Sequence, residues 1–149
     1  MLHVVLTVRR SSIAELRAEE HGLCAMNWHE AHPGEPFAID WELYHRIEDA
    51  GGLDVLAAWE GDHLSGYLVV CHHTHPQSGQ RTAVSAGCYV RPGADAGFAL
   101  RKMLRLGADV AKAGGAEQFY IDDRVDGRLG RILVRDGFRA RSVVYGRSI

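Results

Sequence analysis

"CYVRPGADAGFALRKML", from Cys88 to Leu104, is the stretch that decides the fold. It begins as the end of a strand, passes through a turn of small residues, and continues as an apolar-periodic helix. Such a turn aims the backbone N–H groups of the helix start at one point, and small side chains let a phosphate come near them. The stretch therefore predicts either a phosphate-binding turn or a plain helix start that uses small residues, and Asp95 places a carboxylate where an anion would lie.

Upstream of this stretch the sequence predicts one strand, two helices and a three-stranded meander. Residues 3–8 are β-branched and form the first strand, and Ser12 with Glu15 makes a capping box that opens a helix reaching residue 31. Asp40 caps a second helix, which "GG" at 51–52 ends. The meander strands are expected at 53–60, 64–75 and 81–90.

Downstream, the helix that starts in the turn ends at Gly114-Gly115, and a strand is expected at 116–121. A short helix at 126–136 and an extended segment at 138–149 close the chain. The order β-α-α-β-β-β-α-β-α-β-β predicts an α/β fold with one mixed, mostly antiparallel sheet flanked by helices. Residues 1–149 are expected to form a single domain.

Composition narrows the function classes. A net charge of −2 favours no nucleic acid partner. No apolar run approaches the ~20 residues that span a bilayer, so no membrane association is expected. The three cysteines show no CxxC spacing, which favours reduced thiols in a cytoplasmic protein.

Two segments carry a resemblance to a known family. "YVRPGADAGFALRKML" resembles the acetyl-CoA-binding strand, turn and helix of the GCN5-related N-acetyltransferase (GNAT) superfamily. "GRLGRILVRDGFRARSVVYGRSI" resembles the superfamily's C-terminal helix and last strand, and the order of elements resembles the superfamily over essentially the whole chain. "DWELYHRIEDAGGLDVLAAWEGDHLSGYLVV" and the final "VVYGRSI" resemble small acetyltransferase-like proteins of phages and bacteria.

The resemblance implies transfer of acetyl from acetyl-CoA directly to an amine acceptor, a small molecule or a peptide. A strand that splays from its neighbour leaves backbone groups free to pair with the pantetheine amides, and the turn would hold the pyrophosphate. Similar proteins are often dimers, so a homodimer is among the expectations. The implied cofactor-binding residues are Cys88, Tyr89, Val90, Gly93, Ala94, Asp95, Ala96, Gly97, Phe98, Ala99 and Leu100.

Two departures from the family pattern favour an alternative. The family's Arg or Gln in the turn is replaced by Asp95 in one register and by Ala94 in the other, and Leu133 stands where a catalytic Tyr is frequent. The alternative is a catalytically degenerate GNAT fold that serves as a protein- or ligand-binding module.

The catalytic groups are less well marked. The strand before the turn has no carboxylate or imidazole, and Ser85 and Cys88 are its polar candidates. A base is sought instead in "CHHTH" (71–75), where His72 or His73 could serve, since histidine titrates near neutral pH. We take His73 as the candidate base and Tyr145 as the candidate acid, the latter on residue type alone.

"CHHTH" has two other interpretations. Histidines two apart on a strand can supply two metal ligands, but a site needs three or four, so we expect no metal. A solvated strand end is the simpler interpretation. By the resemblance, the first two helices flank the acceptor cleft, where a set of aromatic side chains would shape it: Trp28, His29, His32, Trp41 and Tyr44.

Overall fold

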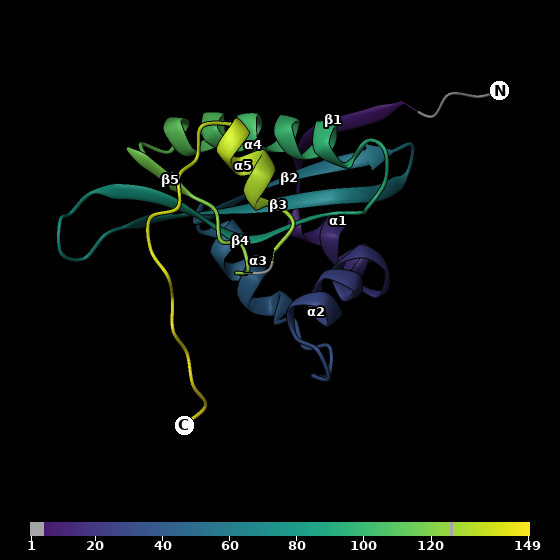
Figure 1. The fold of residues 1–149 in the computed structure, drawn as a ribbon, viewed down its shortest axis with the longest axis horizontal. Coiled ribbons are helices and arrows are strands. Elements are labelled where there is room, and N and C mark those ends of the chain that lie inside the picture. The colour runs from purple at the N-terminus through teal and green to yellow at the C-terminus, as the bar shows by residue number, and fades with distance from the viewer. Residues whose placement is uncertain (1–4, 126) are drawn as a thin grey trace.

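A five-stranded sheet separates two helical layers in the computed structural model, which describes residues 5–125 and 127–149 (Figure 1). The strands in these residues are β1 (Leu6–Ser11), β2 (Leu53–Glu60), β3 (His63–Thr74), β4 (Arg81–Val90) and β5 (Gln118–Tyr120). The helices are α1 (Ile13–Ala18), η1 (Glu20–Cys24), α2 (Ala25–Ala31), α3 (Trp41–Asp49), α4 (Ala96–Ala113) and α5 (Gly130–Arg135). Helices α1 to α3 cover one face, and α4 and α5 cover the other, which confirms the predicted fold class.

The sheet has the order β1-β2-β3-β4-β5, and β5 is the strand that pairs in parallel. The β4–β5 pairing covers only Thr82 to Val84 on β4. On the other side of β4, Val69 pairs with Gly87 and Val70 pairs with Ser85, so Ala86 is the extra residue of a β-bulge. The bulge and the short parallel pairing both lie where the site described below begins.

The first helical layer starts as the sequence predicts. Ser12 accepts a hydrogen bond from the backbone N–H of Glu15 at 3.2 Å, and Asp40 accepts one from Leu43 at 2.9 Å, so both predicted N-caps are confirmed. The single helix expected to reach residue 31 is instead α1, the π-helical turn η1, and α2. Gly22 has φ −97° and ψ −109°, which breaks the helix there.

Two hydrophobic cores fill the spaces between the sheet and its helices. Alternation along β2 sends Val55 toward α1 to α3 and Leu56 toward α4. Leu56, Leu68 and Met103 are fully buried on the α4 side, and each such side chain stabilises the fold by roughly 1.5–3 kcal/mol.

The two closing strands of the expected order do not form in the described residues. Residues 139–149 are exposed and have no sheet partner, with Val144 89% and Tyr145 91% exposed. β-branched and aromatic residues favour a strand only where the backbone finds a neighbour to pair with. The C-terminal segment instead runs away from the body (Figure 1). The expected first strand begins at residue 3, and residues 3 and 4 lie outside the described residues.

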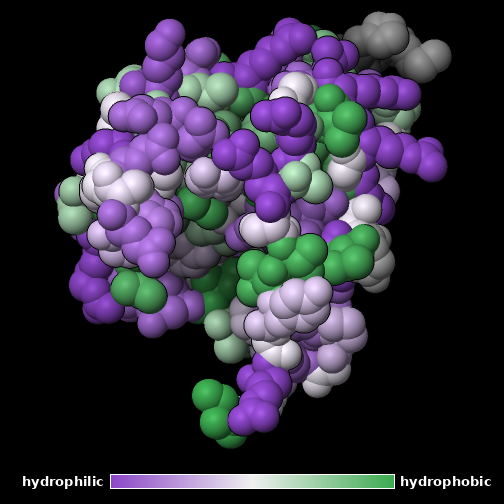
Figure 2. All heavy atoms as spheres, turned by 60° about the vertical axis from the view of Figure 1, so that its left-hand side comes forward, coloured by the Kyte–Doolittle hydropathy of each residue, from purple (hydrophilic) through white to green (hydrophobic). Residues whose placement is uncertain are grey.

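The outer surface is mainly hydrophilic on the face drawn in Figure 2, where hydrophobic side chains show in separate patches. Within residues 5–125 and 127–149, no helix combines the length and the hydropathy that a membrane span needs.

Candidate functional site

The separation of β4 from β5 opens a cavity of about 300 Å³, which we call the strand cavity. At the branch point the backbone N–H of Asp122 donates to Ser85 Oγ at 2.9 Å, so the Ser85 hydroxyl serves the fold. Beyond that point β4 has no β5 neighbour. The walls of the strand cavity are residues 86–90 of β4, the first turns of α4, the end of α2 and the segment after β5. An unpaired strand edge of this kind can pair with a ligand's amide groups.

The predicted cofactor residues divide into two groups around this cavity. Five of them line it: Cys88, Tyr89, Val90, Ala96 and Leu100. The others form the adjoining turn and the first turn of α4: Gly93, Ala94, Asp95, Gly97, Phe98 and Ala99. Most of the predicted residues therefore lie at the cavity or in the turn beside it, whereas Ala99 is 2% exposed and packs in the core.

The turn leaves room for a ligand. A Cβ at Gly93 would meet nothing within 4 Å, and one at Gly97 would meet only Ile132 at 3.8 Å. Neither glycine has a positive φ, so the fold itself requires glycine at neither position. The N–H of Ala96 donates to the backbone oxygen of Gly93 at 3.3 Å, and the other N–H groups of the first turn, which lack partners within the helix, make its start suited to an anion.

Charged side chains around the turn would have opposing effects on a bound phosphate. Asp95 is the N-cap residue of α4, yet its exposed side chain makes no capping hydrogen bond, so its carboxylate is not directed into the helix. The Nζ atom of Lys102 lies 4.7 Å from the centre of the Phe98 ring and brings a positive charge to the same turn. Arg101 lies 3.8 Å from Asp136 at the end of α5.

A polar cluster joins α2 to the segment after β5 across the strand cavity. Glu30 accepts a hydrogen bond from the Tyr89 hydroxyl at 2.8 Å and forms an ion pair with Arg128 at 3.2 Å. Arg124 also pairs with Glu30, at 3.5 Å. Arg128 also lies over the Tyr89 ring, with its guanidinium carbon 5.6 Å from the ring centre. Burial, followed by the hydrogen bond to Glu30, raises the pKa of Tyr89 and keeps its hydroxyl protonated.

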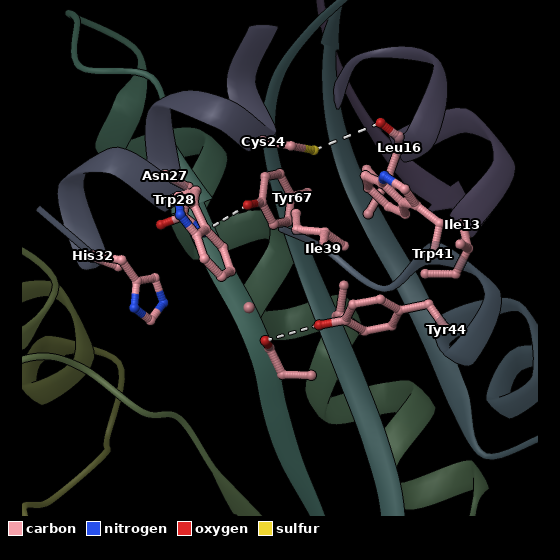
Figure 3. A pocket seen from close by; sticks show the side chains of 14 residues that line it. Ile13, Leu16, Cys24, Asn27, Trp28, His32, Ile39, Trp41, Tyr44 and Tyr67 are labelled. Carbon is pink, nitrogen blue, oxygen red and sulfur yellow. Dashed lines mark hydrogen bonds between the residues drawn. The ribbon is translucent and has the colours of Figure 1, made fainter. Parts of the chain in front are cut away.

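A second cavity of about 150 Å³ lies between α1 to α3 and strands β3 and β4 (Figure 3). We call it the aromatic cavity, and it is lined by Ile13, Leu16, Cys24, Asn27, Trp28, Ala31, His32, Ile39, Trp41, Tyr44, Tyr67, Val69, Ala86 and Gly87. Trp28, His32, Trp41 and Tyr44, which the sequence placed beside an acceptor cleft, all lie on its wall, whereas His29 does not.

The two cavities meet at a seam of five shared lining residues: Asn27, Ala31, His32, Ala86 and Gly87. Ala86 and Gly87 are the bulged part of β4. A Cβ at Gly87 would lie 3.3 Å from the Tyr67 ring, so a larger residue would press on that wall. The bulge thus places small residues on the wall that the two cavities share.

The buried thiol and phenol groups on the wall of the aromatic cavity stay uncharged. Burial raises the pKa of Cys24 to about 12, and it also raises the pKa values of Tyr44 and Tyr67. Asn27 donates to the Tyr67 hydroxyl at 2.6 Å, so each of these wall residues has the other as a partner (Figure 3).

The structure does not bring the two predicted catalytic residues to either cavity. His73 is exposed near the β3–β4 hairpin, with its Nε2 2.9 Å from Thr82 Oγ1. Thr82 and Val90 are eight residues apart on β4, or roughly 26 Å at the rise of a strand. Tyr145 lies in the exposed C-terminal segment.

The structure also bears on the other interpretations of "CHHTH". His72 is nearly buried, and its Nε2 lies 2.7 Å from Asp54 Oδ2, which gives it a structural partner. Within residues 5–125 and 127–149, no three His, Cys, Asp or Glu side chains gather as metal ligands. The three cysteines are free.

Sequence reasoning missed Glu30 and Asn27, which come from α2 rather than from β4. Both lie on the helix that also carries Trp28. The resemblance did place this helix beside the acceptor, and that was the one available signal, but it does not show which face of the helix points inward.

Comparison with known proteins identifies the fold. No protein-family model matches the sequence, and no curated protein matches it. An aminoglycoside acetyltransferase from an uncultured soil metagenomic sample superposes with a TM-score of 0.75 at 14% identity, covering 97% of this chain and 96% of that one. Ribosomal-protein-alanine N-acetyltransferase from Brucella melitensis biovar Abortus 2308 gives 0.72 at 14%, covering 97% and 99%.

A transcriptional regulator from Bacillus halodurans C-125 gives a TM-score of 0.74 at 16% identity, covering 97% of this chain and 100% of that one. At these identities the likeness concerns the fold. The chain has the fold of the GCN5-related N-acetyltransferases.

Proposed function

We propose that this protein is an N-acetyltransferase that moves acetyl from acetyl-CoA to an amine acceptor. The observation that supports this most strongly is the pair of cavities that meet at Ala86 and Gly87. One cavity has the free strand edge and helix start suited to a pantetheine and its phosphates, and the other has the apolar wall suited to an acceptor. A direct transfer needs both ligands to meet, and the seam lets them.

Acetyl-CoA fits the residues present. The strand cavity runs along Cys88 to Val90 and reaches the turn in which Gly93 and Gly97 leave open space. Lys102, beside Phe98, would face the phosphates, and the N–H groups at the start of α4 would donate to them. When bound, acetyl-CoA supplies an acetyl thioester with a good leaving group.

The transfer reaction needs little from the protein beyond the positioning of the two reactants. A neutral amine nitrogen attacks the thioester carbonyl carbon, an N–C bond forms, the C–S bond breaks, and the amine's proton leaves to water or to the departing thiolate. Holding two reactants together can supply much of such a rate enhancement. We assign no role in this step to His73 or Tyr145, because neither lines a cavity.

A second candidate function is a binding module in which the fold persists without transfer. Asp95 favours it, because its carboxylate stands at the start of α4 without a capping bond and would repel a phosphate. The two candidates differ in whether any amine is acetylated.

The deciding experiment incubates the purified chain with acetyl-CoA and a panel of primary amines, with mass spectrometry of the products. Acetylated amine, formed only when the protein is present, supports the transferase. A thermal shift with acetyl-CoA but no acetylated amine favours the binding module, and no shift with millimolar acetyl-CoA would overturn the transferase proposal.

A further inference from the structure

The aromatic cavity has the size of a single small ring. Its volume of about 150 Å³ equals that of an engineered apolar cavity that binds benzene. Ile39, Trp41 and Val69 give it apolar walls, and Figure 3 shows Ile39 and Trp41 among the side chains that line it. One aromatic ring, or an alkyl group of similar volume, would fill it.

The wall of this cavity has no carboxylate of its own, and Glu20, which accepts a hydrogen bond from Trp41 Nε1 at 2.7 Å, lies behind it. None of its fourteen described lining residues is Asp, Glu, Lys or Arg. The strand cavity differs sharply, since it includes Glu30, Asp122, Asp123 and two arginines. Burying an ammonium group without a partner is costly, so the aromatic cavity disfavours a second or third positive charge on its ligand.

Two hydroxyl groups on the wall have partners there, whereas the buried Trp28 Nε1 has none in the described residues and leaves a ligand one donor. The Tyr67 hydroxyl accepts from Asn27, and the Tyr44 hydroxyl lies 3.4 Å from the backbone oxygen of Ala86. A polyhydroxylated ligand would need many partners, and here it would find few. Shape, charge and hydrogen bonding therefore favour the same kind of ligand.

We propose that the aromatic cavity binds the side group of the acceptor, and that the acceptor is a primary monoamine with one aromatic ring or an alkyl group of similar size. This inference rests on the proposed acetyl transfer. With the ring in the cavity, the amine lies at the seam beside Ala86 and Gly87, next to the strand cavity.

The same apolar wall has a chemical consequence. Removal from water by the apolar wall disfavours the ammonium form of the amine, an effect that the carboxylates of the adjoining strand cavity oppose. The attacking nitrogen must be neutral. Desolvation by the cavity thus supplies part of the deprotonation for which β4, between Thr82 and Val90, carries no carboxylate or imidazole.

The experiment compares two amines of opposite character, phenethylamine and spermidine, each with saturating acetyl-CoA, and measures kcat/KM for the acetylated product by mass spectrometry. We expect phenethylamine to be preferred at least tenfold. Spermidine acetylated as well as or better than phenethylamine overturns the inference while leaving the transferase proposal intact.

A pair of variants tests whether the side group of the acceptor binds in the aromatic cavity. Ile39→Asp puts a carboxylate on the wall of the cavity and is expected to lower kcat/KM for phenethylamine at least tenfold, without changing the KM for acetyl-CoA. Leu43→Asp is the matched control, because Leu43 is 45% exposed and does not line the cavity. Unchanged turnover of phenethylamine by a folded Ile39→Asp protein contradicts the proposed location.

Calorimetry separates the two proposals if no amine is acetylated. Binding of phenethylamine to the wild-type chain, lost in Ile39→Asp and kept in Leu43→Asp, supports the cavity assignment even though transfer fails. No binding of phenethylamine overturns the assignment, and no binding of acetyl-CoA overturns the transferase proposal.

Discussion

The substitution Gly97→Glu separates the stability of the turn from its capacity to bind a ligand. Gly97 is the second residue of α4, its φ is not positive, and a Cβ there would meet only Ile132 at ordinary contact distance. A side chain therefore fits. Replacing glycine in a helix gains up to about 1 kcal/mol, and a carboxylate near a helix N-terminus adds roughly 0.3–1 kcal/mol. The free variant is expected to be as stable as the wild type or more so.

Acetyl-CoA should affect the two proteins differently. At a hundred times its dissociation constant, a ligand stabilises the folded state by about 2.7 kcal/mol. For a chain of this size that corresponds to a rise in Tm of roughly 5–11 °C. In Gly97→Glu the new side chain occupies the open space of the turn and its charge opposes the phosphates, so we expect the rise to disappear.

Thermal denaturation followed by circular dichroism, with and without acetyl-CoA, measures both effects. Ala108→Glu is the control, because Ala108 is exposed farther along the same helix and a glutamate there adds the same charge away from the turn. The control should keep the full rise. A rise of wild-type size in Gly97→Glu would place the ligand elsewhere and refute the reasoning.

Three further predictions concern single residues. Gly107→Ala should lower the free energy of unfolding in urea by about 1–2 kcal/mol, because its Cβ would lie 2.9 Å from Leu68 and 3.1 Å from Phe119 in the core; unchanged stability would show that this packing yields. Asp95→Asn should tighten acetyl-CoA binding about two- to fivefold by calorimetry, less at about 0.5 M NaCl, and a weaker affinity would contradict a repulsive role. Cys24 is buried and its pKa is raised to about 12, so its thiol is uncharged at about pH 8. It should therefore resist iodoacetamide at that pH until the chain unfolds. Rapid labelling of the native protein, seen by mass spectrometry, would show that the thiol is accessible.

Local signals in the sequence predict the elements well where the stabilising contact is itself local. The Ser12 and Asp40 caps bond to residues three positions later in the chain, so the sequence contains both partners. The small residues between strand and helix likewise mark the turn at Gly93 to Gly97, because the backbone freedom that they allow depends on those residues alone.

Features that depend on partners far away in the chain are harder to predict from the sequence. The segment around Tyr145 has the composition of a strand, but it stays unpaired because no neighbouring backbone accepts it. His73 has suitable chemistry, but it lies on β3 and pairs with Thr82, at the end of β4 that is far from the turn. That position depends on the β3–β4 register. Glu30 reaches Tyr89, 59 residues away in the chain, only because α2 packs beside the end of β4.

The sequence by itself determined the order of elements from β1 to α5, apart from the break at Gly22, and the strand, turn and helix at residues 88–104, because these depend on periodicity, caps and small residues that act over a few positions. Tertiary structure alone decided that β4 separates from β5 after Val84, that the bulge at Ala86 faces two cavities, and that one of them is uncharged and ring-sized. A cavity is the space left between elements that are far apart in the chain. Its size and charge follow from how those elements pack.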